Sequence, residues 1–166
     1  GVPYVSHLLS VAALVLEHGG TEDQAIAALL HDAVEDQGGR PTAERIRERF
    51  GDLVAEIVDG CTDTDVSPKP PWRLRKEAYV ARVRNEPAHV RLVSAADKLH
   101  NARTMVTDLR IHGPALWERF NAGRDETLWY LESLVAAFRE AGTTPIVEEL
   151  ARTVAELRAV SGNGRG

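Results

Sequence analysis

The chain has 166 residues, of which 43% are hydrophobic and 27% are charged, and its formal net charge is -5. A chain of this length suits one domain that buries about 70% of its unfolded surface, so its core needs no disulfide. The composition excludes a disordered chain, the mild acidity argues against a general nucleic-acid binder, and no apolar run is long enough to span a membrane. These exclusions predict a soluble, cytoplasmic protein with no membrane partner.

The first half of the chain is predicted to form helices separated by glycines. Apolar residues recur every three or four positions from Tyr4 to Val15, and Gly19–Gly20 ends that helix. Thr21 and Gln24 then form a capping box, which marks a helix start, and an almost wholly apolar stretch follows. We expect that stretch to lie near the domain centre. The helices predicted here are 4–18, 25–36, 42–50 and 53–58.

The second half continues the helical pattern after one irregular segment. Residues 63–71 hold three prolines and little periodicity, which predicts a loop or lid. The sequence predicts an all-α globule, with one domain over residues 1–160 and a flexible tail over 161–166. The helices predicted here are 72–85, 87–112, 115–120, 124–141 and 145–160.

Four ionisable residues end the apolar helix 25–36, namely His31, Asp32, Glu35 and Asp36. Charged groups in apolar surroundings are costly unless they are paired or bind a metal. Adjacent helix positions point about 100° apart, so His31 and Asp32 can reach one ion between them. Glu35 follows His31 by one turn on the same side. Taken alone, this segment fits a polar, exposed helix end equally well.

Two residues from other helices extend the candidate site. His7 lies among apolar residues and should face inward, although a lone inward histidine is more often a core residue with a satisfied hydrogen bond. Asp97 lies at the inward edge of an apolar helix, where a carboxylate needs a cation or several donors, and Asn101 follows on the same face. Together, His7, His31, Asp32 and Asp97 form a nitrogen and oxygen set that suits manganese or iron, with zinc as another option.

Sequence patterns at four places match one protein family. Residues 1–7 read G-x-P-Y-x-x-H, residues 27–36 read A-x-L-L-H-D-x-x-E-D, and residues 96–103 read A-D-[KR]-L-x-N-x-R, with a further matching block over 50–62. By these segments the chain resembles the HD superfamily of metal-dependent phosphohydrolases, and more narrowly the hydrolase domain of the RelA/SpoT family and its free-standing small alarmone hydrolases. The likeness extends over about residues 1–130.

This resemblance implies an all-α HD fold and hydrolysis of the 3′-pyrophosphate of guanosine tetra- or pentaphosphate, giving GDP or GTP and pyrophosphate. It further implies a manganese ion, or another divalent cation, held by the ligand set above. The catalytic pair it implies is Glu35 and Asp36, which orient a water and accept its proton. We expect Glu35 to be the base and Asp36 the orienting residue, although the sequence does not separate these roles.

The resemblance also implies substrate contacts. Arg75 and Lys76 match a basic pair beside the family's lid, and Asn101 and Thr104 match positions near the substrate's ribose and phosphates. The spacing of His100 from Asp97 predicts that His100 points elsewhere on its helix, so we leave it out of the site.

Three alternative functions stay open at this point. The family places a guanine-binding Arg-Lys pair before its G-x-P-Y segment, and this sequence starts at Gly1 without it. An adenosine alarmone or a nucleoside phosphate is therefore an alternative substrate. A non-catalytic regulatory HD domain is a second alternative, and an antitoxin role is a third that needs gene context. A homodimer is compatible with the sequence, which does not fix the oligomeric state.

Overall fold

Helices form all the regular secondary structure in the computed structural model, which describes residues 2–64 and 68–162. The absence of strands from these two ranges confirms the all-α prediction. The elements are α1 (Val5–Glu17), α2 (Glu22–Leu30), α3 (Ala33–Asp36), α4 (Arg40–Phe50), α5 (Asp52–Cys61), α6 (Trp72–Val83), α7 (Ala88–His112), the 3₁₀-helix η1 (Gly113–Arg119), α8 (Gly123–Ala141) and α9 (Pro145–Gly162).

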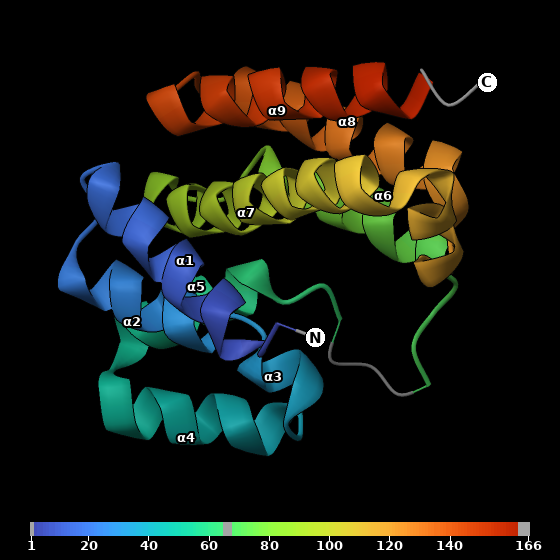
Figure 1. Cartoon of the computed structure of the whole chain (residues 1–166). Coiled ribbons are helices and arrows are strands. Elements are labelled where there is room, and N and C mark those ends of the chain that lie inside the picture. The colour runs from blue at the N-terminus through green and yellow to red at the C-terminus, as the bar shows by residue number, and fades with distance from the viewer. Residues whose placement is uncertain (1, 65–67, 163–166) are drawn as a thin grey trace.

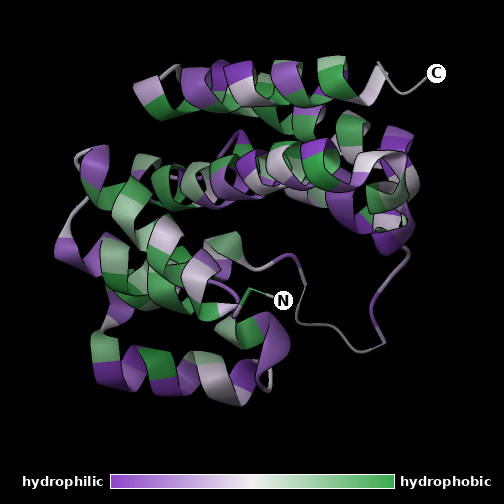
Figure 2. Ribbon diagram, in the orientation of Figure 1, coloured by the Kyte–Doolittle hydropathy of each residue, from purple (hydrophilic) through white to green (hydrophobic). Residues whose placement is uncertain are grey.

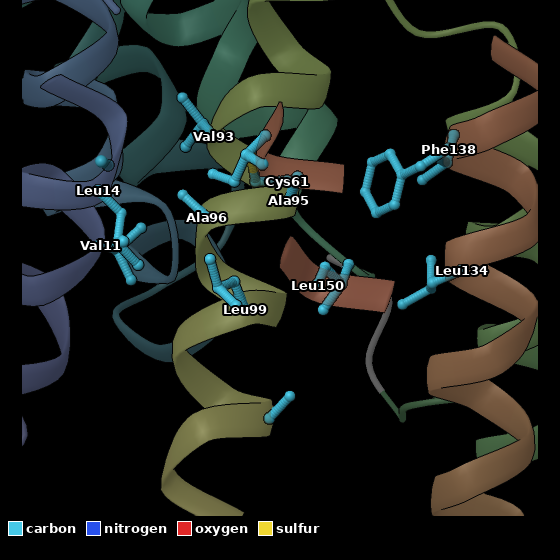
Figure 3. Packing of buried hydrophobic residues seen from close by; sticks show 14 of the residues in the cluster. Val11, Leu14, Cys61, Val93, Ala95, Ala96, Leu99, Leu134, Phe138 and Leu150 are labelled. Atoms are coloured by element: carbon cyan, nitrogen blue, oxygen red, sulfur yellow. The ribbon is translucent and has the colours of Figure 1, made fainter. Parts of the chain in front are cut away.

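The long helix α7 is the centre of the molecule. It contacts α1, α2 and α5 on one side and α8 and α9 on the other, as Figure 1 shows. Its middle is buried around most of its circumference, which is typical of a helix enclosed by others. Figure 3 shows Val11 and Leu14 of α1 on one side of α7, with Leu134 and Phe138 of α8 on the other. The polar residues Ser94 and Asp97 on this part of α7 are therefore held deep inside the domain.

The predicted capping box fixes the start of α2 and its place against α7. The backbone N–H of Gln24 donates to Thr21 Oγ1 at 3.3 Å, and that of Thr21 donates to Gln24 Oε1 at 2.8 Å. The Gln24 side chain also donates to the backbone oxygen of His89, at the start of α7, at 3.1 Å. One residue thus caps α2 and ties it to α7.

The predicted helix 25–36 is wrong in one respect, because the structure breaks it at His31 and Asp32. α2 ends at Leu30, and α3 starts at Ala33. The His31 Nδ1–H donates to the backbone oxygen of Ala28 at 2.7 Å, and that oxygen would accept from the Asp32 N–H in a continuous helix. A side chain that donates a hydrogen bond to a helix carbonyl oxygen competes with the backbone N–H that would otherwise bond to it, and the helix is interrupted there.

Other boundaries differ from the predictions by small amounts. α4 starts at Arg40 rather than Thr42, and a 3₁₀-helix replaces the α-helix expected over 115–120. α9 continues through Gly162, so the first residues of the predicted tail are helical, whereas 163–166 lie outside the described residues.

The outer helix α4 is hydrophilic. Figure 2 shows that α4, at one edge of the molecule, is mostly hydrophilic, and Ile46 is its only buried residue. No helix within the described residues is both long enough and apolar enough to cross a membrane.

Candidate metal centre

Three predicted ligands from separate parts of the chain converge on one point. His7 lies on α1, His31 follows α2, and Asp97 lies on α7; one ligand atom from each lies within 4.8 Å of the others. The Nε2 atoms of His7 and His31 are 3.3 and 3.5 Å from Asp97 Oδ1 and 3.4 Å from each other. The inward orientation predicted for His7 is confirmed, since only 12% of its side chain is exposed.

The fourth predicted ligand, Asp32, lies beside this group. Its Oδ2 is 3.2 Å from His31 Nε2, and a third of its side chain is exposed. The hydroxyl of Tyr4 donates a hydrogen bond to the same oxygen. Burial alone would raise the pKa of Asp32, but its hydrogen bonds to His31 and Tyr4 and the charge of His31 together lower it. Asp32 therefore presents an ionised carboxylate at the mouth of the group.

Asp97 is a buried carboxylate with two donors of its own. Asn101 Nδ2, which lies on the same helix face as predicted, donates to Oδ1 at 2.7 Å, and Lys98 Nζ lies 2.6 Å from Oδ2. Burial alone would raise the pKa of Asp97, but the Lys98 ammonium and the hydrogen bonds to His31 and His7 hold it well below its usual range. Its negative charge is thus retained inside the domain, where it can attract a cation.

The donor set fits a divalent cation. Two imidazole nitrogens and a carboxylate oxygen face one another in a largely buried position, with the second carboxylate, that of Asp32, alongside. Mixed nitrogen and oxygen sets suit manganese, iron or zinc. Burial alone would lower the pKa of His31, but its hydrogen bonds to Asp32 and Asp97 raise it to about 10. In the metal-free protein the His31 ring is therefore protonated at neutral pH.

Metal binding is expected to displace a proton from His31, because a coordinating imidazole must be neutral. Since the metal-free pKa is raised to about 10, the apparent affinity for Mn²⁺ should rise about tenfold per pH unit across the neutral range. Isothermal titration with MnCl₂ in buffers of different ionisation enthalpy should reveal the released proton. An affinity that does not change with pH would contradict this expectation.

The two predicted catalytic acids lie on the short helix α3, directly after His31 and Asp32. Lys69 Nζ lies 2.6 Å from Glu35 Oε1, and only 20% of the Glu35 side chain is exposed. Burial and the neighbouring charges of Asp32 and Glu35 raise the pKa of Asp36. The two carboxylates thus differ in environment, with one paired to a lysine and the other under the field of its acidic neighbours.

Asn101 contributes to the walls of two cavities that flank the candidate metal centre. One has a volume of about 360 Å³ and is lined in part by Lys76 and Lys98. The other has a volume of about 570 Å³ and is lined in part by His7 and Thr104. Two of the predicted substrate contacts, Asn101 and Thr104, therefore face open space beside the site.

The other two predicted substrate contacts are held by an acidic partner. Both Arg75 and Lys76 form ion pairs with the buried carboxylate of Asp63, with Lys76 Nζ at 3.0 Å. Trp72, at the start of the same helix, packs edge-on against Tyr130 and lines the 360 Å³ cavity. Of the basic pair, Lys76 lines the 360 Å³ cavity, whereas Arg75 also donates a hydrogen bond to the backbone oxygen of Pro70.

The prediction that His100 points away from the site is wrong. Its Nδ1 lies 2.7 Å from Nδ1 of His7, and the two ring centroids are 4.8 Å apart. The sequence held a signal for this contact, since His100 follows Asp97 by three positions and such residues are neighbours on a helix surface. Burial and the nearby His7 lower the pKa of His100.

The chain is similar in sequence to several proteins that are named as hydrolases. A family model described as an HD domain matches residues 1–128. A relative from Xenopus tropicalis, guanosine-3′,5′-bis(diphosphate) 3′-pyrophosphohydrolase MESH1, is 35% identical over 148 residues, which cover 88% of this chain and 75% of the relative. A guanosine-3′,5′-bis(diphosphate) 3′-pyrophosphohydrolase from Haemophilus influenzae is 38% identical over 111 residues, and the match covers 63% of this chain but only 16% of that protein.

Two solved structures have similar folds. The crystal structure of lmo0812 from Listeria monocytogenes EGD-e has a TM-score of 0.79 and 32% identity, covering 95% of this chain and 98% of its own. A structure described as a metazoan ortholog of SpoT that hydrolyses ppGpp has a TM-score of 0.75 and 27% identity, covering 96% of this chain and 83% of its own.

Proposed function

Because this chain belongs to the HD-domain family, whose model matches residues 1–128, we propose that it hydrolyses the 3′-pyrophosphate of guanosine tetra- or pentaphosphate. The products are pyrophosphate and GDP or GTP. The observation that carries this proposal is that His7, His31 and Asp97 converge, with the Glu35–Asp36 pair on the short helix that follows His31. Its support is the similarity to MESH1 over most of both chains. The substrate is an intracellular nucleotide, and on that ground we propose a cytoplasmic location.

We propose that manganese is the metal and that His7, His31, Asp32 and Asp97 hold it. A bound divalent cation lowers the pKa of water and polarises phosphoryl oxygens. The ion pair with Lys98 keeps Asp97 charged in the domain interior, and the Tyr4 hydroxyl restrains Asp32. These two contacts keep both carboxylates in position before a cation arrives.

The remaining chemistry belongs to the acids of α3. Glu35 accepts the proton of the attacking water, whose oxygen bonds to the phosphorus attached to the ribose 3′ oxygen. The bond between that phosphorus and the 3′ oxygen breaks, a proton returns to the 3′ oxygen, and pyrophosphate leaves. Lys69 keeps the Glu35 carboxylate in place through its ion pair, and Asp36 orients the water. Removal of a proton by a positioned carboxylate of this kind accelerates a reaction by about 10²- to 10⁴-fold.

We propose that the substrate lies across Asn101, between the two flanking cavities. The 360 Å³ cavity presents three basic side chains, from Lys76, Lys98 and Arg119, which attract phosphate groups. The 570 Å³ cavity presents Thr104 and has a mostly apolar wall that suits the nucleoside. Since Asn101 lines both, its amide is placed to contact the substrate between its phosphates and its base.

Purified protein supplied with MnCl₂ is expected to release pyrophosphate and GDP from guanosine tetraphosphate, and chelation should abolish this release. The adenosine analogue and GMP serve as matched substrates, because they differ in the base or lack the 3′-diphosphate. Turnover of the adenosine analogue or GMP alone would retain the metal site and reassign the substrate. No turnover of any of them, with manganese bound, would favour a regulatory domain.

A further inference from the structure

The two imidazoles of the candidate metal centre are arranged alike. Each turns Nε2 toward Asp97, at 3.3 Å for His7 and 3.5 Å for His31. Each also turns Nδ1 toward a partner outside the centre. For His31 the partner is the backbone oxygen of Ala28 at 2.7 Å, and for His7 it is Nδ1 of His100, also at 2.7 Å.

The chemistry of imidazole gives the outer contacts a definite role. A ring nitrogen binds a cation through its lone pair, so Nε2 of a coordinating histidine carries no proton. The neutral ring then carries its proton on Nδ1, which must be donated to an acceptor. A backbone oxygen serves His31 in this way. For His7, the acceptor must be Nδ1 of His100, which then carries its own proton on Nε2.

We propose that His100 is the positioning residue for His7, accepting the His7 Nδ1–H and so fixing the tautomer and the ring orientation that expose Nε2 to the cation. The inference rests on the metal site of the proposed function. His100 lies on the same helix as Asp97, three positions later. The central helix α7 therefore supplies one ligand and orients a second that comes from α1.

Two substitutions separate the hydrogen bond from the shape of the side chain. His100→Asn retains an acceptor, because the asparagine Oδ1 is the same number of bonds from the backbone as Nδ1 of histidine. His100→Leu has the same branching as asparagine and no acceptor. His112→Leu serves as the control, since His112 is an exposed histidine at the end of the same helix.

The first measurement is Mn²⁺ affinity, from the free-ion signal in electron paramagnetic resonance. His100→Leu is expected to weaken binding about 10- to 100-fold, the usual effect of losing a partner that orients a metal ligand. His100→Asn should retain most of the affinity, and His112→Leu should match the wild-type protein. The helical circular-dichroism spectrum should be the same in all four proteins.

The second measurement observes the proton itself. In ¹⁵N-labelled protein loaded with diamagnetic Zn²⁺, the His7 Nδ1–H should be protected from solvent exchange in the wild type and in His100→Asn. In His100→Leu this protection should be lost.

These measurements distinguish a failure of the role of His100 from a failure of the metal site itself. Wild-type affinity for Mn²⁺ in His100→Leu, or unchanged protection of the His7 proton, would overturn this inference alone. A wild-type protein that binds no Mn²⁺ would overturn both the metal site and the role of His100.

Discussion

Replacing Asp97 with alanine is expected to abolish divalent-metal binding and hydrolysis together. Asp97 is the only carboxylate among the three ligands that converge within 4.8 Å, and its Oδ1 faces both imidazoles. Without it, His7 and His31 bring no negative charge to a cation in the buried part of the site. Mn²⁺ titration and pyrophosphate release measure the two losses on one preparation.

The same change is expected to destabilise the fold, because Lys98 would remain as a largely buried cation without its partner. Only 15% of the Lys98 side chain is exposed, and its Nζ lies 2.6 Å from Asp97 Oδ2. Breaking a buried pair by removing one partner costs about 3–5 kcal/mol of the free energy of unfolding. Urea-induced unfolding would measure this cost.

A double variant, Asp97→Ala with Lys98→Met, separates the two effects. The uncharged methionine should restore most of the lost stability, while metal binding and turnover should stay absent. If the double variant regained metal binding, Asp97 would not be a ligand. If Asp97→Ala were as stable as the wild type, the ion pair between Asp97 and Lys98 would not contribute to the free energy of unfolding as expected.

Replacing Glu35 with glutamine is expected to leave Mn²⁺ binding nearly unchanged while turnover falls about 10²- to 10⁴-fold. Glu35 lies outside the three-ligand group, on α3, and its carboxylate pairs with Lys69 at 2.6 Å. Glutamine has nearly the same shape but cannot accept the proton of the attacking water.

The measurements are kcat for guanosine tetraphosphate and Mn²⁺ affinity on the same sample. Glu148→Gln is a matched control, because Glu148 on α9 also accepts hydrogen bonds from a basic side chain, Arg139, at 2.8 Å. The control should retain full rate. Full rate in Glu35→Gln would remove this residue from the mechanism, and loss of Mn²⁺ binding would reassign it as a ligand.

The helical periodicity of the sequence was sufficient to predict most of the fold. Helix faces in this domain bury against α7, so apolar residues recur at helical spacing, and glycines or prolines mark most helix ends. The break at His31 could not be predicted in this way, because it depends on a side chain that takes the backbone oxygen of Ala28. The spacing of apolar residues shows which face of a helix is buried, but it does not indicate where a side chain bonds to a backbone oxygen.

The sequence was sufficient to predict the site residues that are polar within apolar helices, but not the residues whose position depends on an ion pair with a distant part of the chain. His7, His31 and Asp97 were polar residues within apolar helices, which is a strong signal, and the structure brings them together. The pairing of Arg75 and Lys76 with Asp63 depends on the tertiary position of Asp63 beside α6, which composition does not encode. The three-residue spacing of His100 from Asp97 places both side chains on neighbouring parts of one helix surface, which is sufficient to predict that His100 lies near the site.

The ligands come from α1, from the turn after α2 and from α7, which are far apart along the chain. A cation held by all of them would act as a reversible cross-link between positions 7, 31 and 97 of the family-matched segment 1–128. Binding that occurs only in the folded state adds about 2.7 kcal/mol when the free ligand is at a hundred times its Kd. The concentration of the bound divalent cation in a cell would then affect how long each molecule survives unfolding and proteolysis, as well as how fast it turns over substrate.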